Sequence, residues 1–451
     1  MISSSAAVPV LAARLSIATA KILNYALAPS PATIFGCLLP APWLGMLAGL
    51  LLAFGPMLGF GLALPDRFAP LTLAVTHWLV LGMLAPIMIG ALFQLMPVVA
   101  GQTVAWARTI SPFVALISAV IAACLSMGFL RGDTTGFIWA ARLAGILYGS
   151  VVLALATTAW RIHVVDATTR TLRWIALALA IVVVLGIALA GSFAGWWQID
   201  VSRWLDLHVA WGLVGWIATL VIGVASTTVP MFWQTVRPAS ASYWQRSLPG
   251  VLWLPLFLFF FSGFRQFSIV LGCAILASIS SIAMRAVWHA KRSVDPAWIL
   301  WLTCSMCWLL AALLTALFSV FGTHFSAELT LAFPWWIGVL VLVGGAVLPV
   351  NAMLGKIIPF LIFLHLRRQI PLGRRVPAMQ AVLPPQRLKW QARLVLLALV
   401  LLLLLPLSPG IFAVLAGIAF AASQGLMGAL LMLSLFRYRR ELRSVILARS
   451  S

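Results

Sequence analysis

Long apolar runs recur along almost the whole chain and constrain its fold more than any other feature. Each run is about 20 residues long, which is enough for a helix to cross a hydrocarbon core of about 30 Å. Hydrophobic residues make up 63% of the 451 residues and charged residues only 8%, against about 25% in soluble proteins. The runs lack the two-residue alternation of a membrane β-barrel strand. The sequence therefore predicts an all-α, polytopic membrane protein.

The runs predict about twelve transmembrane helices in a single domain over residues 41–436. We place these helices near residues 42–64, 71–99, 110–130, 137–160, 172–193, 207–232, 248–264, 266–289, 297–319, 334–365, 391–407 and 409–436. We expect residues 1–40 to form a cytoplasmic lead-in and residues 437–451 a basic cytoplasmic tail.

Basic residues alternate between the two sides of this arrangement. Twenty-three Lys and Arg residues fall in the loops of one side and five in the loops of the other. Because positive charge marks the cytoplasmic side, we expect both termini inside, in a bacterial inner membrane. The net charge of +21 therefore has a topological cause, and no nucleic-acid partner is expected. The Arg-rich loop 366–393 is expected to bind anionic lipid headgroups.

The second, sixth and tenth predicted helices are unusually long and rich in glycine. Each carries a late proline (Pro97, Pro230 and Pro359), and these prolines are 133 and 129 residues apart. This spacing predicts three four-helix units with a pseudo-threefold arrangement, near residues 41–165, 166–295 and 296–436. The alternative is that any membrane helix with Gly and Pro resembles any other.

Two of these helices begin with a histidine, and this pattern resembles the catalytic subunits of the haem–copper oxidase superfamily. The closest likeness is to cbb3-type oxidases and nitric oxide reductases. The segment around His77 is similar to the family's second helix, and His208 with Gly212, Gly215 and Trp216 is similar to its sixth. The resemblance implies haem b as a cofactor, copper as a possible one, and respiratory proteins as possible partners.

The chain departs from the family where the oxygen chemistry would be. The seventh helix, LPGVLWLPLFLFFFSGF, has no histidine to supply copper ligands, and the tenth has none in its outer half. The family's cross-linked tyrosine has no evident counterpart. The resemblance therefore implies a member without the binuclear centre, so terminal oxidase activity and catalytic residues are not expected.

His77 and His208 are the leading candidates for ligands, since imidazole binds haem iron and copper. The alternative is that each ring only makes hydrogen bonds at the membrane interface. Arg142, Arg203 and Arg265 are predicted on the same side, where they could meet haem propionates or be merely interfacial.

Three polar residues are predicted within or at the edge of the membrane: Gln94, Asn351 and Lys356. Intramembrane polar groups are costly and often mark a pathway or a site. Lys356 could instead extend its ammonium group to the inner headgroups.

These features lead to one functional expectation and two alternatives. We expect a membrane protein that binds haem b or a metal ion near the periplasmic face, in a respiratory or nitric-oxide-related role in electron transfer, sensing or support. The alternatives are a secondary transporter or permease for a small solute or metal, and a scaffold or assembly factor without a ligand.

Overall fold

The computed structural model describes residues 25–61, 65–235, 248–291, 295–370 and 376–450, and these residues form helices joined by short turns. Eleven helical spans within these ranges are long and apolar enough to cross a membrane. The all-α, polytopic architecture predicted from the apolar runs is therefore confirmed. A twelfth apolar helix, α12 (Leu248–Leu258), is shorter and lies between the sixth and eighth spans.

The eleven spans and α12, counted together from one to twelve, follow one another in this order: α2 (Pro31–Leu38) with α3 (Ala41–Phe54); α4 (Pro70–His77), η3 (Trp78–Leu84) and α5 (Ala85–Ala100); α6 (Ala107–Arg131); α7 (Thr134–Ala159); α8 (Ala167–Phe193); α9 (Val201–Ala210), η4 (Trp211–Ala218) and α10 (Thr219–Trp233); α12; η5 (Ser262–Phe264) with α13 (Arg265–Trp288); α14 (Pro296–Phe321) with η6 (Gly322–His324); α15 (Ala327–Val339), η7 (Leu340–Val347) and α16 (Leu348–Gln369); α18 (Pro385–Leu404) with η8 (Leu405–Leu407); and α19 (Pro409–Ser450). Short elements between or before them are η1 (Tyr25–Leu27), η2 (Pro56–Leu58) and α17 (Met379–Val382).

The first span begins earlier than the sequence indicated. Helix α2 lies inside the expected lead-in, and its Ile34 and Cys37 are buried where it packs against α5 and α6. Pro31 starts the helix, and Pro40 lies at the turn into α3, so α2 and α3 form two halves of one span. Residues 1–24 of the lead-in, residues 62–64 of the expected first helix and Ser451 of the tail lie outside the described residues.

Aspartate side chains cap the N-termini of several helices, so few carboxylates remain for other contacts. The carboxylates of Asp133, Asp166, Asp200 and Asp295 accept hydrogen bonds from the first-turn amides of α7, α8, α9 and α14. These bonds satisfy amides that have no partner within the helix. In the turn before α7, the side chain and amide of Thr135 hold the pKa of Asp133 below its usual value.

The second, sixth and tenth spans share one irregular design, which supports the three-unit repeat. Each contains a π-helical segment, namely η3, η4 or η7, and in each the late proline stands 19 residues after the first residue of that segment. A π turn changes the hydrogen-bonding register of a helix and re-aims the side chains that follow. The three helices therefore change their hydrogen-bonding register at equivalent positions.

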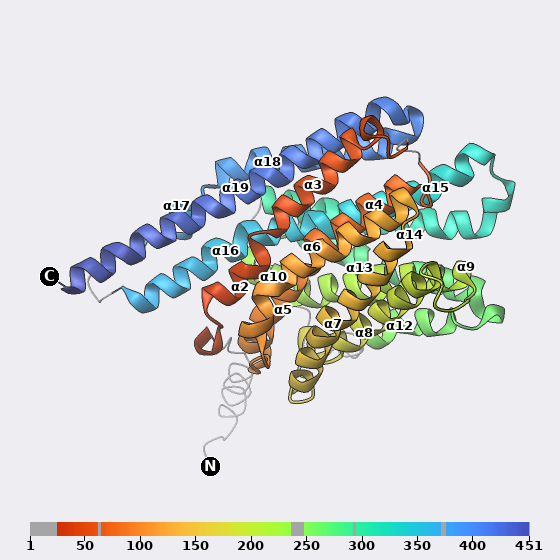
Figure 1. Ribbon diagram of the computed structural model, residues 1–451. Helices are drawn as coiled ribbons and strands as arrows, with labels where there is room; N and C mark the ends of the chain where they lie inside the picture. The colour runs from red at the N-terminus through yellow and green to blue at the C-terminus, as the bar shows by residue number, and fades with distance from the viewer. Residues whose placement is uncertain (1–24, 62–64, 236–247, 292–294, 371–375, 451) are drawn as a thin grey trace, which may run out of the picture.

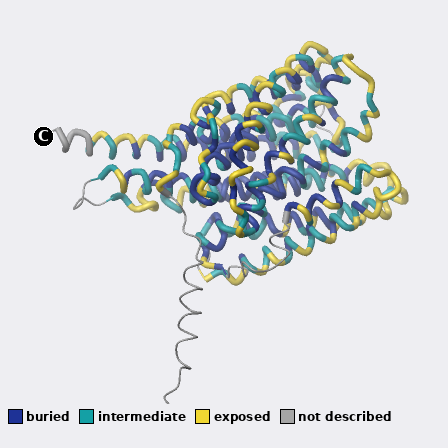
Figure 2. The backbone as a smooth tube through the Cα atoms, turned by 90° about the horizontal axis from the view of Figure 1, so that it is seen from below, coloured by how far each residue is buried: buried dark blue, intermediate teal, exposed yellow. Residues whose placement is uncertain are grey.

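Helix packing closes the three units into a ring. The last span of each unit packs along the first span of the next: α7 on α8, α13 on α14, and α19 on α3 (Figure 1). Helices α10, η7 and α16 belong to the long spans at the centre, and buried residues gather there while exposed residues lie around the outside (Figure 2). Leu116, Ile146 and Ile411 on the outer surface are 64%, 67% and 62% exposed, as expected for a surface that faces lipid.

Candidate functional site

His77 ends α4, two turns into the second span and directly before its π-helical segment. Its Nδ1 lies 2.7 Å from the carbonyl oxygen of Leu73, which can only accept, so Nδ1 carries the proton. In the neutral ring the lone pair is then on Nε2. A ring held in this way by a backbone carbonyl is the usual arrangement for a histidine that binds a metal through its other nitrogen.

His208 lies at the corresponding end of the sixth span, three residues before the π-helical segment η4. Its ring packs against α8 at Gly186, where an added Cβ would lie 3.1 Å from the imidazole Cε1, and it also interacts with the backbone at Val182. Its Nδ1 is buried and has no hydrogen-bond partner. One nitrogen of this ring is therefore buried without a partner, beside Gly186 of α8.

His77 and His208 are near enough to interact electrostatically. A row of aromatic rings begins at His77: His77 to Phe129 at 5.1 Å, Phe129 to Phe137 at 5.3 Å, and Phe137 to Phe193 at 5.2 Å between ring centroids. Neither Gly186 nor this row stood out in the sequence, because a glycine or a phenylalanine in an apolar run carries no distinguishing signal.

Within the described ranges, no group of three or more His, Cys, Asp or Glu side chains is placed to enclose a metal ion. His77 and His208 thus offer imidazole nitrogens without a full protein cage. Imidazole nitrogen is a ligand type that both haem iron and copper accept.

The three arginines predicted near this end have partners of their own. Arg203 donates to the carbonyl oxygen of Phe260 at 2.6 Å, and Arg265 pairs with Asp206 at 2.5 Å. Arg67 forms a second ion pair with Asp206, with 3.7 Å between its guanidinium nitrogen and the other carboxylate oxygen. The guanidinium of Arg142 stacks over Trp139 at 5.6 Å. The contacts of Arg203, Arg265 and Arg67 join different helix ends, with Asp206 as a shared acceptor. Arg142 and Trp139 both lie on α7.

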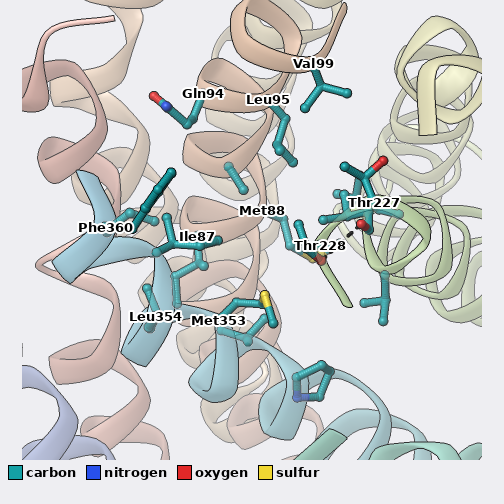
Figure 3. A pocket seen from close by; sticks show the side chains of 18 of the residues that line it. Ile87, Met88, Gln94, Leu95, Val99, Thr227, Thr228, Met353, Leu354 and Phe360 are labelled. Carbon is teal, nitrogen blue, oxygen red and sulfur yellow. Dashed lines mark hydrogen bonds between the residues drawn. The ribbon is translucent and has the colours of Figure 1, made fainter. Parts of the chain in front are cut away.

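A cavity of about 130 Å³ lies between the later halves of the second, sixth and tenth spans (Figure 3). Its lining is almost wholly apolar and includes Met88 on α5, Thr228 on α10 and Met353 on α16. Gln94 is part of the lining, is 8% exposed, and has no partner for its Oε1. The second, sixth and tenth spans therefore border one largely apolar internal space.

Asn351 and Lys356 lie on α16, but their surroundings differ. Asn351 is buried beside the π-helical segment, and neither atom of its amide has a partner. Lys356 forms an ion pair with Asp295, and its ammonium group lies 5.6 Å from the centre of the Trp233 ring. Since Asp295 also caps α14, Lys356 reaches a helix end rather than the cavity.

The arrangement therefore has two separate features: the pair of histidines and an apolar cavity that Gln94 borders. The two histidines lie toward the end of the bundle at which helices α4 and α9 start. The cavity with Gln94 lies between α5, α10 and α16, which are the later halves of the three long spans. No protein-family model matches this chain, and no curated protein matches it in sequence.

Proposed function

We propose that this multi-pass membrane protein binds haem b or a metal ion such as copper through His77 and His208. The observation that carries the proposal is the hydrogen bond from Nδ1 of His77 to the carbonyl oxygen of Leu73, which leaves Nε2 as a free lone-pair donor. A backbone carbonyl that fixes the ring in this tautomer is the usual support of a ligating histidine.

His208 supports the proposal through a nitrogen that lacks a partner. Leaving a buried polar group without a hydrogen bond costs about 1–3 kcal/mol. A ligand bound at Nδ1 of His208 recovers that cost. The contact with Gly186 and the interaction at Val182 hold the ring against α8, so little motion is needed to bind.

Each residue has a defined part in such a site. His77 and His208 bind the iron or copper, Leu73 fixes the tautomer of His77, and Phe129 and its neighbours exclude water. Haem or copper would supply one-electron chemistry or a binding centre for a small gas. The likeness of the His77 and His208 segments to haem–copper oxidases favours a respiratory or nitric-oxide-related role in electron transfer, sensing or support, near the periplasmic face.

The test is an optical spectrum and a metal analysis of the protein purified in detergent from haem-replete, copper-replete cells. We expect either a Soret band or about one bound copper per chain, lost in His77→Ala and in His208→Ala. His324→Ala is the matched control, because His324 lies in an exposed turn away from the pair. A colourless, metal-free wild-type protein, or binding that survives both substitutions, would contradict the proposal.

The cavity favours a second candidate, a secondary transporter or permease for a small, largely apolar solute. Helices with internal prolines and π-helical turns surround it on three sides, and bent helices around a central site are typical of transporters. A colourless, metal-free preparation in the experiment above leaves this candidate as the better one.

A further inference from the structure

An open groove runs along the outside of the bundle between α18 and α19. Its volume is about 410 Å³, compared with about 30 Å³ for one water molecule in the liquid. Arg387 and Trp390 on α18 and four residues of α19 line it: Leu426, Ala429, Leu430 and Leu433. The groove is distinct from the histidine pair and from the central cavity.

The floor of the groove is one apolar stripe. The four α19 residues are spaced at i, i+3, i+4 and i+7, which places them on one face of the helix. They lie within the span that reaches from Pro409 to Ser444, so the stripe belongs to the membrane-crossing part of α19. A stripe of this kind fits a hydrocarbon chain that lies parallel to the helix.

The wall on α18 is basic and aromatic. Arg387 is exposed, and among the described residues no hydrogen bond or ion pair engages its guanidinium. Trp390, one turn later, is 63% exposed and lies under the guanidinium of Arg393 at 4.9 Å. The sequence has no acidic residue between 366 and 393. This end of the groove therefore attracts an anion, and an exposed indole is typical of the level of lipid headgroups.

We propose that the groove binds one anionic phospholipid, with its phosphate on Arg387 and an acyl chain along Leu426, Leu430 and Leu433. An amphipathic ligand is required because the basic wall and the apolar floor belong to the same groove. Basic pockets between transmembrane helices commonly bind anionic lipid headgroups. The inference does not depend on any cofactor at His77 and His208.

The test is native mass spectrometry of the full-length protein with two added lipids of identical chains, palmitoyl-oleoyl phosphatidylglycerol and palmitoyl-oleoyl phosphatidylcholine. We expect retention of the phosphatidylglycerol to exceed that of the phosphatidylcholine. Arg387→Gln should lower the preference about fivefold, the effect of one basic residue on an anionic lipid. Arg439→Gln, which removes an exposed charge from α19 outside the groove, is the matched control and should leave the preference unchanged.

A second variant tests the apolar floor. Ala429 is exposed on the floor, and Ala429→Phe would fill the space between the helices, so retention of both lipids should fall while the helices remain folded. Excess inorganic phosphate should not displace the lipid, since phosphate lacks the chain. Equal retention of the two lipids by the wild type, or a preference that survives Arg387→Gln, would overturn the proposal.

Discussion

Gly186 sets how closely the imidazole of His208 approaches α8. An added Cβ would lie 3.1 Å from Cε1 of that ring, so Gly186→Ala should push the imidazole away by a few tenths of an ångström. Changes to residues that orient a ligand typically cost about tenfold or more in affinity. If His208 binds haem or copper as proposed, we expect the occupancy of the purified protein to fall accordingly, measured by its Soret absorbance or its copper content.

Gly149→Ala on α7 is the control, because an added Cβ there meets no atom within 4 Å. Full occupancy in Gly186→Ala would show that the ring of His208 is not held at this contact.

The two candidate histidines stood out in the sequence, whereas the residues that contact them did not. His77 and His208 stood out because histidine is rare in the chain, with six in 451 residues, and because both precede a long Gly-rich run. Gly186 is one glycine among 33, and its contact with His208 depends on how α8 packs against α9. Likewise, the partner of Lys356 is Asp295, 61 residues away, and only the packing of α14 on α16 brings them together.

At the scale of helices, the sequence revealed the period of the long spans but not their π-helical turns. The spacing of Pro97, Pro230 and Pro359 predicted the repeat, because proline is recognisable in the sequence. A π turn has no such sequence signal, since it arises from how a helix accommodates its neighbours. Directly after η4, the hydroxyl of Thr219 donates to the carbonyl oxygen of Val214, five residues earlier, and accepts from the indole of Trp253 on α12.

The contact between α3 and α19 closes the ring, and two glycines make it possible. An added Cβ at Gly417 would lie 2.6 Å from the carbonyl oxygen of Gly49, and one at Gly49 would lie 2.7 Å from the amide of Ala421. Small residues let membrane helices approach to backbone contact. Gly417→Val should therefore force the first and last spans apart and destabilise the protein by about 1–3 kcal/mol, the usual cost of overpacking.

Thermal unfolding in detergent measures this effect. Gly410→Val on the same helix is the matched control, because no atom lies within 4 Å of an added Cβ there. Equal melting temperatures for the two variants would mean that the closure of the ring does not depend on this contact.

For the whole molecule, the side of the membrane on which each loop after α12 lies depends on whether α12 completes a crossing of the membrane. Its 11 residues span only about 16 Å, roughly half of a hydrocarbon core. Two contacts show that it runs antiparallel to the sixth span: Trp253 bonds Thr219 at 3.1 Å, and Phe260, just beyond the helix, accepts from Arg203 at 2.6 Å. The described part of α12 thus ends beside the start of α9.

The charge pattern decides between the two possible topologies, because both termini lie on one side only if the number of crossings is even. With twenty-three basic residues expected inside and five outside, we predict that α12 crosses. Alkaline phosphatase is active only outside the inner membrane, so fusions truncated after Gly132 and Ser262 should be active and those after Arg161 and Lys291 inactive. If α12 does not cross, Ser262 and Lys291 exchange sides while Gly132 and Arg161 keep theirs. That exchange would move most of the basic residues after α12 to the outer side, against the rule that sets membrane orientation, and would make eleven the number of crossings.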